Sequence, residues 1–211
     1  MSAGAASILG RVEPGTARGH GGGGPASTRI TVAYGFWIFL LSDIIMFSTL
    51  FATYAVLKGA TAGGPDGRAL FELKTVGYET ACLLFSSYTC GIGFLSAERH
   101  RVELFYGCFA ITFLLGAAFL GFEASEFARM VAMGAGPARS AFLSAFFSLV
   151  GLHGLHVTVG LLWLVYLVAQ TAAFGLKDFV CRRLHCFSLF WHALDIIWVA
   201  LFTLVYLMGV Q

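Results

Sequence analysis

Apolar residues occur along the chain in five long blocks, each separated from the next by a short polar stretch. A bilayer core of about 30 Å is crossed by roughly 20 helical residues, and every block reaches that length. The connections carry most of the Gly, Pro and charge, as in KGATAGGPDGRALFELK. The pattern predicts an all-α integral membrane bundle of five transmembrane helices, at about residues 32–57, 76–97, 104–127, 141–173 and 186–208.

The start of the chain lacks such a block. Its first 29 residues are rich in Gly and Ala and contain the run GHGGGGP at residues 19–25. This composition cannot bury enough apolar surface to offset the entropy lost on ordering. We therefore expect a disordered cytoplasmic tail over residues 1–29 and a five-helix transmembrane domain over residues 30–211.

The basic residues are divided unequally between the two ends of the predicted helices. The tail and loops on the side of the N-terminus hold eight Lys and Arg residues, and those on the opposite side hold five. Because cytoplasmic loops carry an excess of Lys and Arg, we expect the N-terminus in the cytoplasm and the C-terminus outside.

Composition supports a membrane protein and leaves little room for a soluble domain. Hydrophobic residues make up 58% of the chain and charged residues 11%, whereas soluble domains carry about a quarter charged residues. The connections are too short to hold a catalytic domain of their own. Five cysteines, an odd number, argue against a disulfide framework.

Ionisable residues lie inside the predicted spans, where each costs about 2.5–3.5 kcal/mol on insertion scales and needs a partner or a task. A rise of about 1.5 Å per residue sets their depth. One set lies near the bilayer midplane: Asp43, His153, His156, His192 and Asp195. A second set lies toward the outer ends of the spans: Glu79, Glu123 and Glu126. We expect an intramembrane polar network that consists of Asp43, Glu79, Glu123, His153, His156, His192 and Asp195.

Four interpretations of this network compete. His153 and His156 lie on one helix and cannot bind one haem iron from both faces, although His192 could supply a second ligand. Copper or zinc needs three or four converging ligands, and the stretch CRRLHC matches neither a haem-attachment nor a paired zinc motif. A transporter would have broken helices at the midplane, but none of the four prolines lies mid-span. Hydrogen bonds between helices are favoured, with no metal ligand and no catalytic residue.

An unpaired carboxylate near the midplane is costly. We therefore expect Asp43 to pair with a histidine of the fourth span, His153 or His156. Because these histidines are three residues apart and share a helix face, we expect the other one to contact Asp195 or a backbone carbonyl.

Three segments carry a resemblance to a known family: YGFWIFLLSDIIMFSTLFATYAVL, AFLSAFFSLVGLHGLHVTVGLLW and FSLFWHALDIIWVALFTLVYLMG. With their HGLHV and WHxxDxxW motifs they resemble subunit III of the haem-copper respiratory oxidases, over about residues 35–209. The cytochrome c oxidase branch usually has Glu where Asp43 stands, whereas the quinol-oxidase branch carries Asp. Asp43 and the five-span length look most like subunit III of the bacterial cytochrome bo ubiquinol oxidase.

The resemblance implies an accessory subunit without redox centres, in a bacterial inner-membrane complex that oxidises ubiquinol, reduces oxygen to water and pumps protons. It implies haems and copper in subunit I, subunits I, II and IV as partners, and no nucleic acid. The implied architecture sets the first two helices against the other three around a V-shaped cleft that holds phospholipid. Arg99 and Arg101, near span ends, are candidates to bind the lipid headgroups. The implied roles are assembly, stability of the catalytic subunit and an oxygen route.

Other functions stay open at this point. Within the family, the alternatives are subunit III of a cytochrome c oxidase and the accessory protein of nitric oxide reductase. Outside it, the alternative is an independent proton-coupled transporter that uses Asp43, His153 and Asp195.

Overall fold

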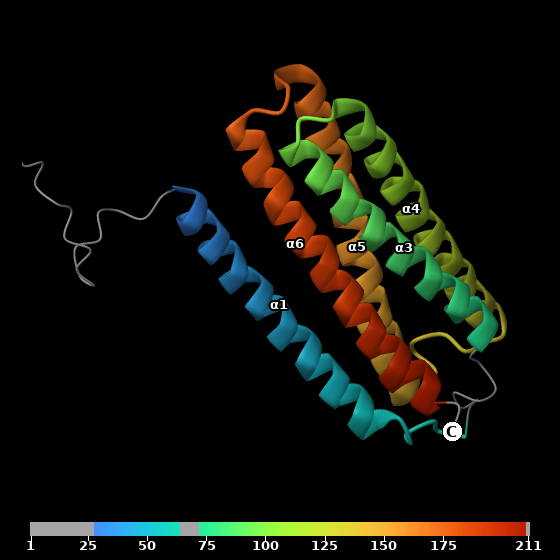
Figure 1. The fold of residues 1–211 in the computed structure, drawn as a ribbon. Coiled ribbons are helices and arrows are strands. Elements are labelled where there is room, and N and C mark those ends of the chain that lie inside the picture. Colours follow the sequence, from blue (N-terminus) through green and yellow to red (C-terminus); the bar gives the residue numbers. More distant parts are fainter. Residues whose placement is uncertain (1–27, 64–71, 210–211) are drawn as a thin grey trace, which may run out of the picture.

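The chain forms a bundle of long helices that lie side by side (Figure 1). The computed structural model describes residues 28–63 and 72–209, and these ranges contain helices and turns but no strand. Five helices are long and apolar enough to cross a membrane, which confirms the predicted all-α fold with five spans. Their bounds are α1 Thr28–Leu57, α3 Leu73–Glu98, α4 Val102–Ala132, α5 Ala141–Phe174 and α6 Asp178–Leu201, and α6 continues into the π-helix η1, Phe202–Leu207.

The helices extend beyond the apolar blocks that predict them. α6 begins at Asp178 rather than at Cys186, so the polar stretch CRR belongs to a helix and not to a loop. Hydropathy marks the part of a helix inside the hydrocarbon, whereas backbone hydrogen bonds continue into the polar interface. α1 likewise begins at Thr28, so Thr28 and Arg29 are helical, and residues 1–27 of the expected tail lie outside the described residues.

The helices α3, α4, α5 and α6 form a closed ring, and α1 lies outside it. Around this four-helix ring α3 packs against α4, α4 against α5, α5 against α6 and α6 against α3. α1 packs against α5 and α6, at the edge of the bundle in Figure 1. This arrangement differs from the expected grouping of the first two helices against the other three. The reason is the short turn at residues 99–101, which makes α3 and α4 antiparallel neighbours.

α1 contacts the ring through one stripe of side chains spaced alternately three and four residues apart. Leu40, Phe47 and Tyr54 are its buried members, and Phe36 and Asp43 are partly buried members of the same stripe. This spacing is that of two helices packed with a small left-handed crossing angle. Because Asp43 belongs to the stripe, its carboxylate faces the ring. Met46, Leu50, Phe51 and Leu57 are also partly buried against the ring, and most of the other α1 side chains are exposed. In the most apolar stretch of this span 11% of the residues are buried, against 44% for the span of α6 and η1.

Candidate functional site

The seam between α1 and α5 holds an acid–histidine pair. Oδ2 of Asp43 lies 3.9 Å from Nε2 of His156, and the two side chains are 14% and 17% exposed. The ring of Phe47 packs against the imidazole of His156, with centroids 5.3 Å apart. This separation falls within the range of an ion pair with a protonated histidine and exceeds that of a direct hydrogen bond. The predicted contact of Asp43 with a histidine of α5 is confirmed, and His156 is the partner.

The hydrogen bond of the second ring nitrogen of His156 indicates which nitrogen carries a proton. Nδ1 is 2.8 Å from the carbonyl oxygen of Leu152. Because a carbonyl only accepts, Nδ1 donates, and in the neutral ring Nε2 then presents a lone pair to Asp43. A lone pair and an ionised carboxylate repel, so the contact is attractive only when one proton is held on Nε2 or on Asp43. His156 thus faces α1 through Nε2 and keeps its other ring nitrogen bonded to the backbone of α5.

His153 faces the interior of the four-helix ring. It is completely buried, and its ring packs against Phe119 and Trp198 at centroid distances of 5.8 and 5.3 Å. Among the described residues neither ring nitrogen has a hydrogen-bond partner, so the expected contact with Asp195 or a backbone carbonyl is wrong. Residues three apart on a helix diverge by about 60°, which directs His156 toward α1 and His153 into the ring.

His192 and Asp195 on α6 contact α3 rather than the histidines of α5. Nδ1 of His192 lies 2.6 Å from Oγ of Ser87, and the carboxylate of Asp195 interacts with both Ser87 and His192. In a catalytic triad the acid binds the second ring nitrogen of the histidine, whereas here it also contacts the serine itself. The grouping therefore fits a link between helices better than a nucleophile.

Two tryptophans extend this link into a row of hydrogen bonds between α6 and α3. The indole N–H of Trp191 donates to Oγ of Ser86 at 3.1 Å, and that of Trp198 donates to Oγ1 of Thr80 at 3.0 Å. The two tryptophans are seven residues apart and so lie on one face of α6. The WHxxDxxW motif thus supplies one side of a helix–helix interface, and the hydroxyl groups of α3, which sequence reasoning missed, supply the other.

A second polar group, the acid cluster, lies inside the ring where α3, α4 and η1 meet. It consists of Glu79, Glu123, Glu126 and Tyr206. The three glutamates are 0%, 4% and 3% exposed, and their charges interact with one another. The hydroxyl of Tyr206 donates to Oε2 of Glu126 at 3.1 Å, and Oε1 of the same glutamate lies 3.9 Å from Arg129. The predicted outer set of acids is thus brought together in one place.

Gly154, between the two histidines of GLHGLH, makes room for the acid cluster. A β-carbon at this position would lie 2.5 Å from Oε1 of Glu123, which is closer than real side chains approach. Glycine therefore lets the carboxyl group lie directly against the backbone of α5. The sequence did not indicate Gly154 and Tyr206 as members of this site. A Gly or a Tyr in a membrane span does not by itself indicate which residue it contacts.

Basic residues gather at one end of the bundle, where α3 and α5 end and α4 and α6 begin; we name it the basic end. Arg99 and Arg101 are exposed in the turn between α3 and α4. Arg182 and Arg183 border an opening of about 360 Å³ between the start of α1 and the α5–α6 pair, and Trp163 is part of its apolar wall. Arg182 and Arg183 were not expected at a cleft, because their stretch reads as a loop.

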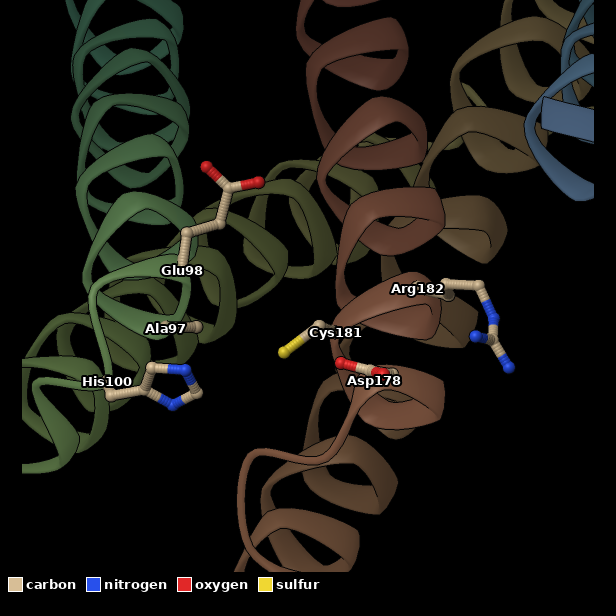
Figure 2. A pocket seen from close by; sticks show the side chains of 6 residues that line it. All are labelled: Ala97, Glu98, His100, Asp178, Cys181 and Arg182. Carbon is tan, nitrogen blue, oxygen red and sulfur yellow. The ribbon is translucent and has the colours of Figure 1, made fainter. Parts of the chain in front are cut away.

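A cavity of about 540 Å³ lies at the same end, between the end of α3 and the start of α6 (Figure 2). Cys181 points toward His100, whereas Arg182 points to the other side of α6. Cys186 borders the opening beside α1 instead. The two cysteines of CRRLHC therefore face different spaces, and in the described ranges no three His, Cys, Asp or Glu side chains converge to hold a metal ion.

Comparison of the sequence with known proteins assigns the chain to a family. The sequence profile of the family described as cytochrome c oxidase subunit III matches residues 16–210. The chain belongs to the cytochrome c oxidase subunit III family. This membership confirms the resemblance to subunit III of the haem-copper oxidases.

Individual relatives point to one branch of the family. The chain is 53% identical over 176 residues to the cytochrome bo(3) ubiquinol oxidase subunit 3 of Pseudomonas aeruginosa, covering 83% of this chain and 84% of that protein. The Pseudomonas putida protein of the same name is 49% identical over 176 residues, with coverages of 83% and 85%. The quinol oxidase subunit 3 of Bacillus subtilis is 46% identical over 175 residues, with coverages of 83% and 86%.

Proposed function

We propose that this chain is the accessory subunit III of a terminal ubiquinol oxidase, an inner-membrane complex that oxidises ubiquinol, reduces oxygen to water and pumps protons. The observation that carries the proposal is the identity of 53% and 46%, over 83% of the chain, with relatives named as quinol oxidase subunits. Asp43 agrees with it, because the quinol-oxidase branch has Asp at this point of the first shared helix.

The role proposed for the chain is structural, with haems and copper held by subunit I and with subunits II and IV as further partners. Two features support it. The described side chains bring no three potential metal ligands together, and the Asp43–His156 and Ser87–His192 contacts cross helix interfaces. The chain then supports assembly and protects the catalytic subunit during turnover, and contributes no catalytic residue.

Phospholipid is the ligand proposed for the basic end. Arg182 and Arg183 border an opening with an apolar wall of Phe36 and Trp163. A guanidinium group binds a lipid phosphate, while the wall receives the upper part of an acyl chain. The exposed Arg99 and Arg101 are proposed as additional headgroup contacts. With the N-terminus in the cytoplasm, as the distribution of Lys and Arg favours, this lipid belongs to the cytoplasmic leaflet.

Purification of the chain from its native membrane tests the proposed function. We expect subunits with haem to co-purify with an affinity-tagged chain in a mild detergent, with a reduced-minus-oxidised haem spectrum and oxygen consumption driven by ubiquinol. Oxygen consumption driven by cytochrome c instead would assign the chain to a cytochrome c oxidase. Reduction of nitric oxide by the purified complex would assign it to a nitric oxide reductase. A colourless chain that purifies alone and carries out proton-coupled transport would establish the transporter and contradict the proposal.

A second measurement tests the stabilising role. Deletion of the chain should leave the initial rate of ubiquinol oxidation nearly unchanged and shorten the time over which the complex stays active during turnover. A complex whose initial rate is abolished, although subunit I carries its full haem content, would contradict a purely structural role.

A further inference from the structure

The acid cluster is a group of buried ionisable side chains inside the four-helix ring. Glu79 is fully buried on α3, and neither of its carboxyl oxygens has a hydrogen-bond partner among the described residues. Its charge interacts with those of Glu123 and Glu126 on α4. One carboxyl oxygen of each of these α4 glutamates also lacks a hydrogen-bond partner in the described part of the chain. Glu79 thus adds an unpartnered acid from a second helix to the pair on α4.

The ionisable groups around the cluster come from every element that packs on it. On α3 Cys82 interacts with Glu79, and on η1 Tyr206 donates to Glu126. On α5, Gly154 lies against Glu123, and His153 precedes it. Arg129 on α4 lies 3.9 Å from Glu126 and 3.2 Å from Glu72, so its positive charge is shared with a second acid. Among the residues that the structure describes, carboxyl groups therefore outnumber the cations that face them.

The excess of carboxyl groups over cations determines what the acid cluster can bind. An isolated ionised carboxylate inside a protein is costly, and neighbouring carboxylates that interact cannot all be ionised. Arg129 compensates one negative charge at most, so the remaining charge is removed by protons shared among the acids. We propose that Glu79, Glu123 and Glu126 form a proton-binding site that exchanges protons with the membrane surface near Arg129 and Glu72.

A route to the surface is present in the same contacts. The exposed fraction of the side chain rises from 2% in Glu126 to 35% in Arg129 and 60% in Glu72, so the three side chains lead from the interior of the ring to the outside. Tyr206 lies in a π-helix, an irregularity that is frequent at functional sites. The site holds and releases protons without any redox step, and it lies at the opposite end of the bundle from the basic end.

Infrared spectroscopy of the purified complex tests the proposal. A protonated carboxylic acid has a carbonyl-stretch band that an ionised carboxylate lacks. We expect Glu79→Gln and Glu123→Gln each to remove intensity from this band. Transfer of the unmodified complex to deuterium oxide should shift the same band, because the acid proton exchanges. The control is Glu103→Gln, an exposed acid in the first turn of α4, which should leave the band unchanged.

The outcomes that overturn the proposal are distinct. If neither glutamine variant loses band intensity relative to Glu103→Gln, the acids are ionised and bind no proton. If the band is lost in the variants but does not shift in deuterium oxide, the acids are protonated but closed to exchange.

A second variant covers the case in which the glutamine variants fail to assemble. Tyr206→Phe keeps all three acids and removes one hydrogen bond to Glu126, so the band should shift in frequency; an unchanged band would contradict the proposal. These measurements can be made on any preparation that contains the chain. Failure of the haem-bearing subunits to co-purify therefore overturns the proposed function alone.

Discussion

α1 and α3 both pack against α6, but they are held there by different contacts. α3 is joined to α6 by a row of hydrogen bonds, from Trp198 to Thr80, from Trp191 to Ser86 and between His192 and Ser87. α1 lies outside the ring and contacts it through an apolar stripe, in which Asp43 faces His156 on α5. The difference teaches that α3 is held by three hydrogen bonds in one row, whereas α1 is held by its apolar stripe and two separate polar contacts, the Asp43–His156 pair and the hydrogen bond from Tyr54 to the carbonyl of Val205.

The difference between the contacts of α1 and α3 matters because both helices lie in lipid. In a bilayer no hydrophobic driving force holds two apolar helices together, because lipid tails are as apolar as the side chains. Packing density and polar contacts between helices then decide how tightly each helix is bound. We therefore expect changes inside the ring to destabilise the whole chain, and changes at the seam to release α1 while the ring stays folded.

The largest effect is expected for Trp198→Ala, inside the ring. Trp198 is fully buried, packs on Phe119 with ring centroids 4.6 Å apart and donates to Thr80. Truncation leaves a cavity and should lower the free energy of unfolding by about 3–5 kcal/mol, measured by denaturant titration of the purified complex with the unfolding of this chain as readout. The control is Trp37→Ala on α1, whose side chain is 50% exposed. Equal losses for both variants would contradict the stronger packing of the ring.

Gly154→Ala should have the next largest effect, because its β-carbon would overlap the carboxyl group of Glu123. Overpacking of this kind costs about 1–3 kcal/mol. Gly151→Ala is the matched control on the same helix, since the nearest side-chain atom to its β-carbon, in Phe127, is 3.7 Å away. We expect the control to be neutral or slightly stabilising, as Ala usually is in a helix. If both variants behave alike in the same titration, Gly154 is not a spacer for the acid cluster.

Asp43→Leu should weaken the α1–α5 seam by about 0.6–1.7 kcal/mol, the range measured for polar contacts between membrane helices. Asp43→Asn should cost less, because its amide N–H can donate to Nε2 of His156. A double-mutant cycle with His156→Leu, read as release of α1 to limited proteolysis, measures the coupling. Additive effects would show that the pair contributes nothing. Loss of initial turnover in a fully assembled Asp43→Asn complex would replace the structural role with proton relay.

The smallest effect is expected for Ser87→Ala, which removes the contact with His192 from the row between α3 and α6. Since two tryptophan hydrogen bonds remain beside it, the loss should be about 0.6 kcal/mol or less. Thr53→Ala serves as control, because its hydroxyl donates to the carbonyl of Thr49 within α1 at 2.8 Å. A loss for Ser87→Ala larger than that for Asp43→Leu would reverse the comparison between the two helices.

Local composition by itself determined where the spans lie, how many there are and which ionisable residues fall inside them. Partition of a segment into the bilayer depends on its own length and apolar content, so the five spans follow from the sequence without knowledge of any neighbouring helix. The pairing of Asp43 with α5 also followed, because an intramembrane acid needs a partner. Helix ends did not follow, since Asp178 and its neighbours are polar and yet helical.

Only the tertiary structure decided which helix faces meet. The spans are apolar on nearly every side, so no polar face marks the side that is buried, and the four-helix ring with α1 outside could not be read from the pattern. The same holds for the acid cluster: Glu79 is separated from Glu123 by more than one helix length in sequence, and packing of α3 on α4 brings them together. His153 illustrates that spacing in the sequence does not decide which helix a side chain contacts. Its position three residues from His156 predicts a shared face, but the 60° between them, about one sixth of a helical turn, directs one histidine to α1 and the other into the ring.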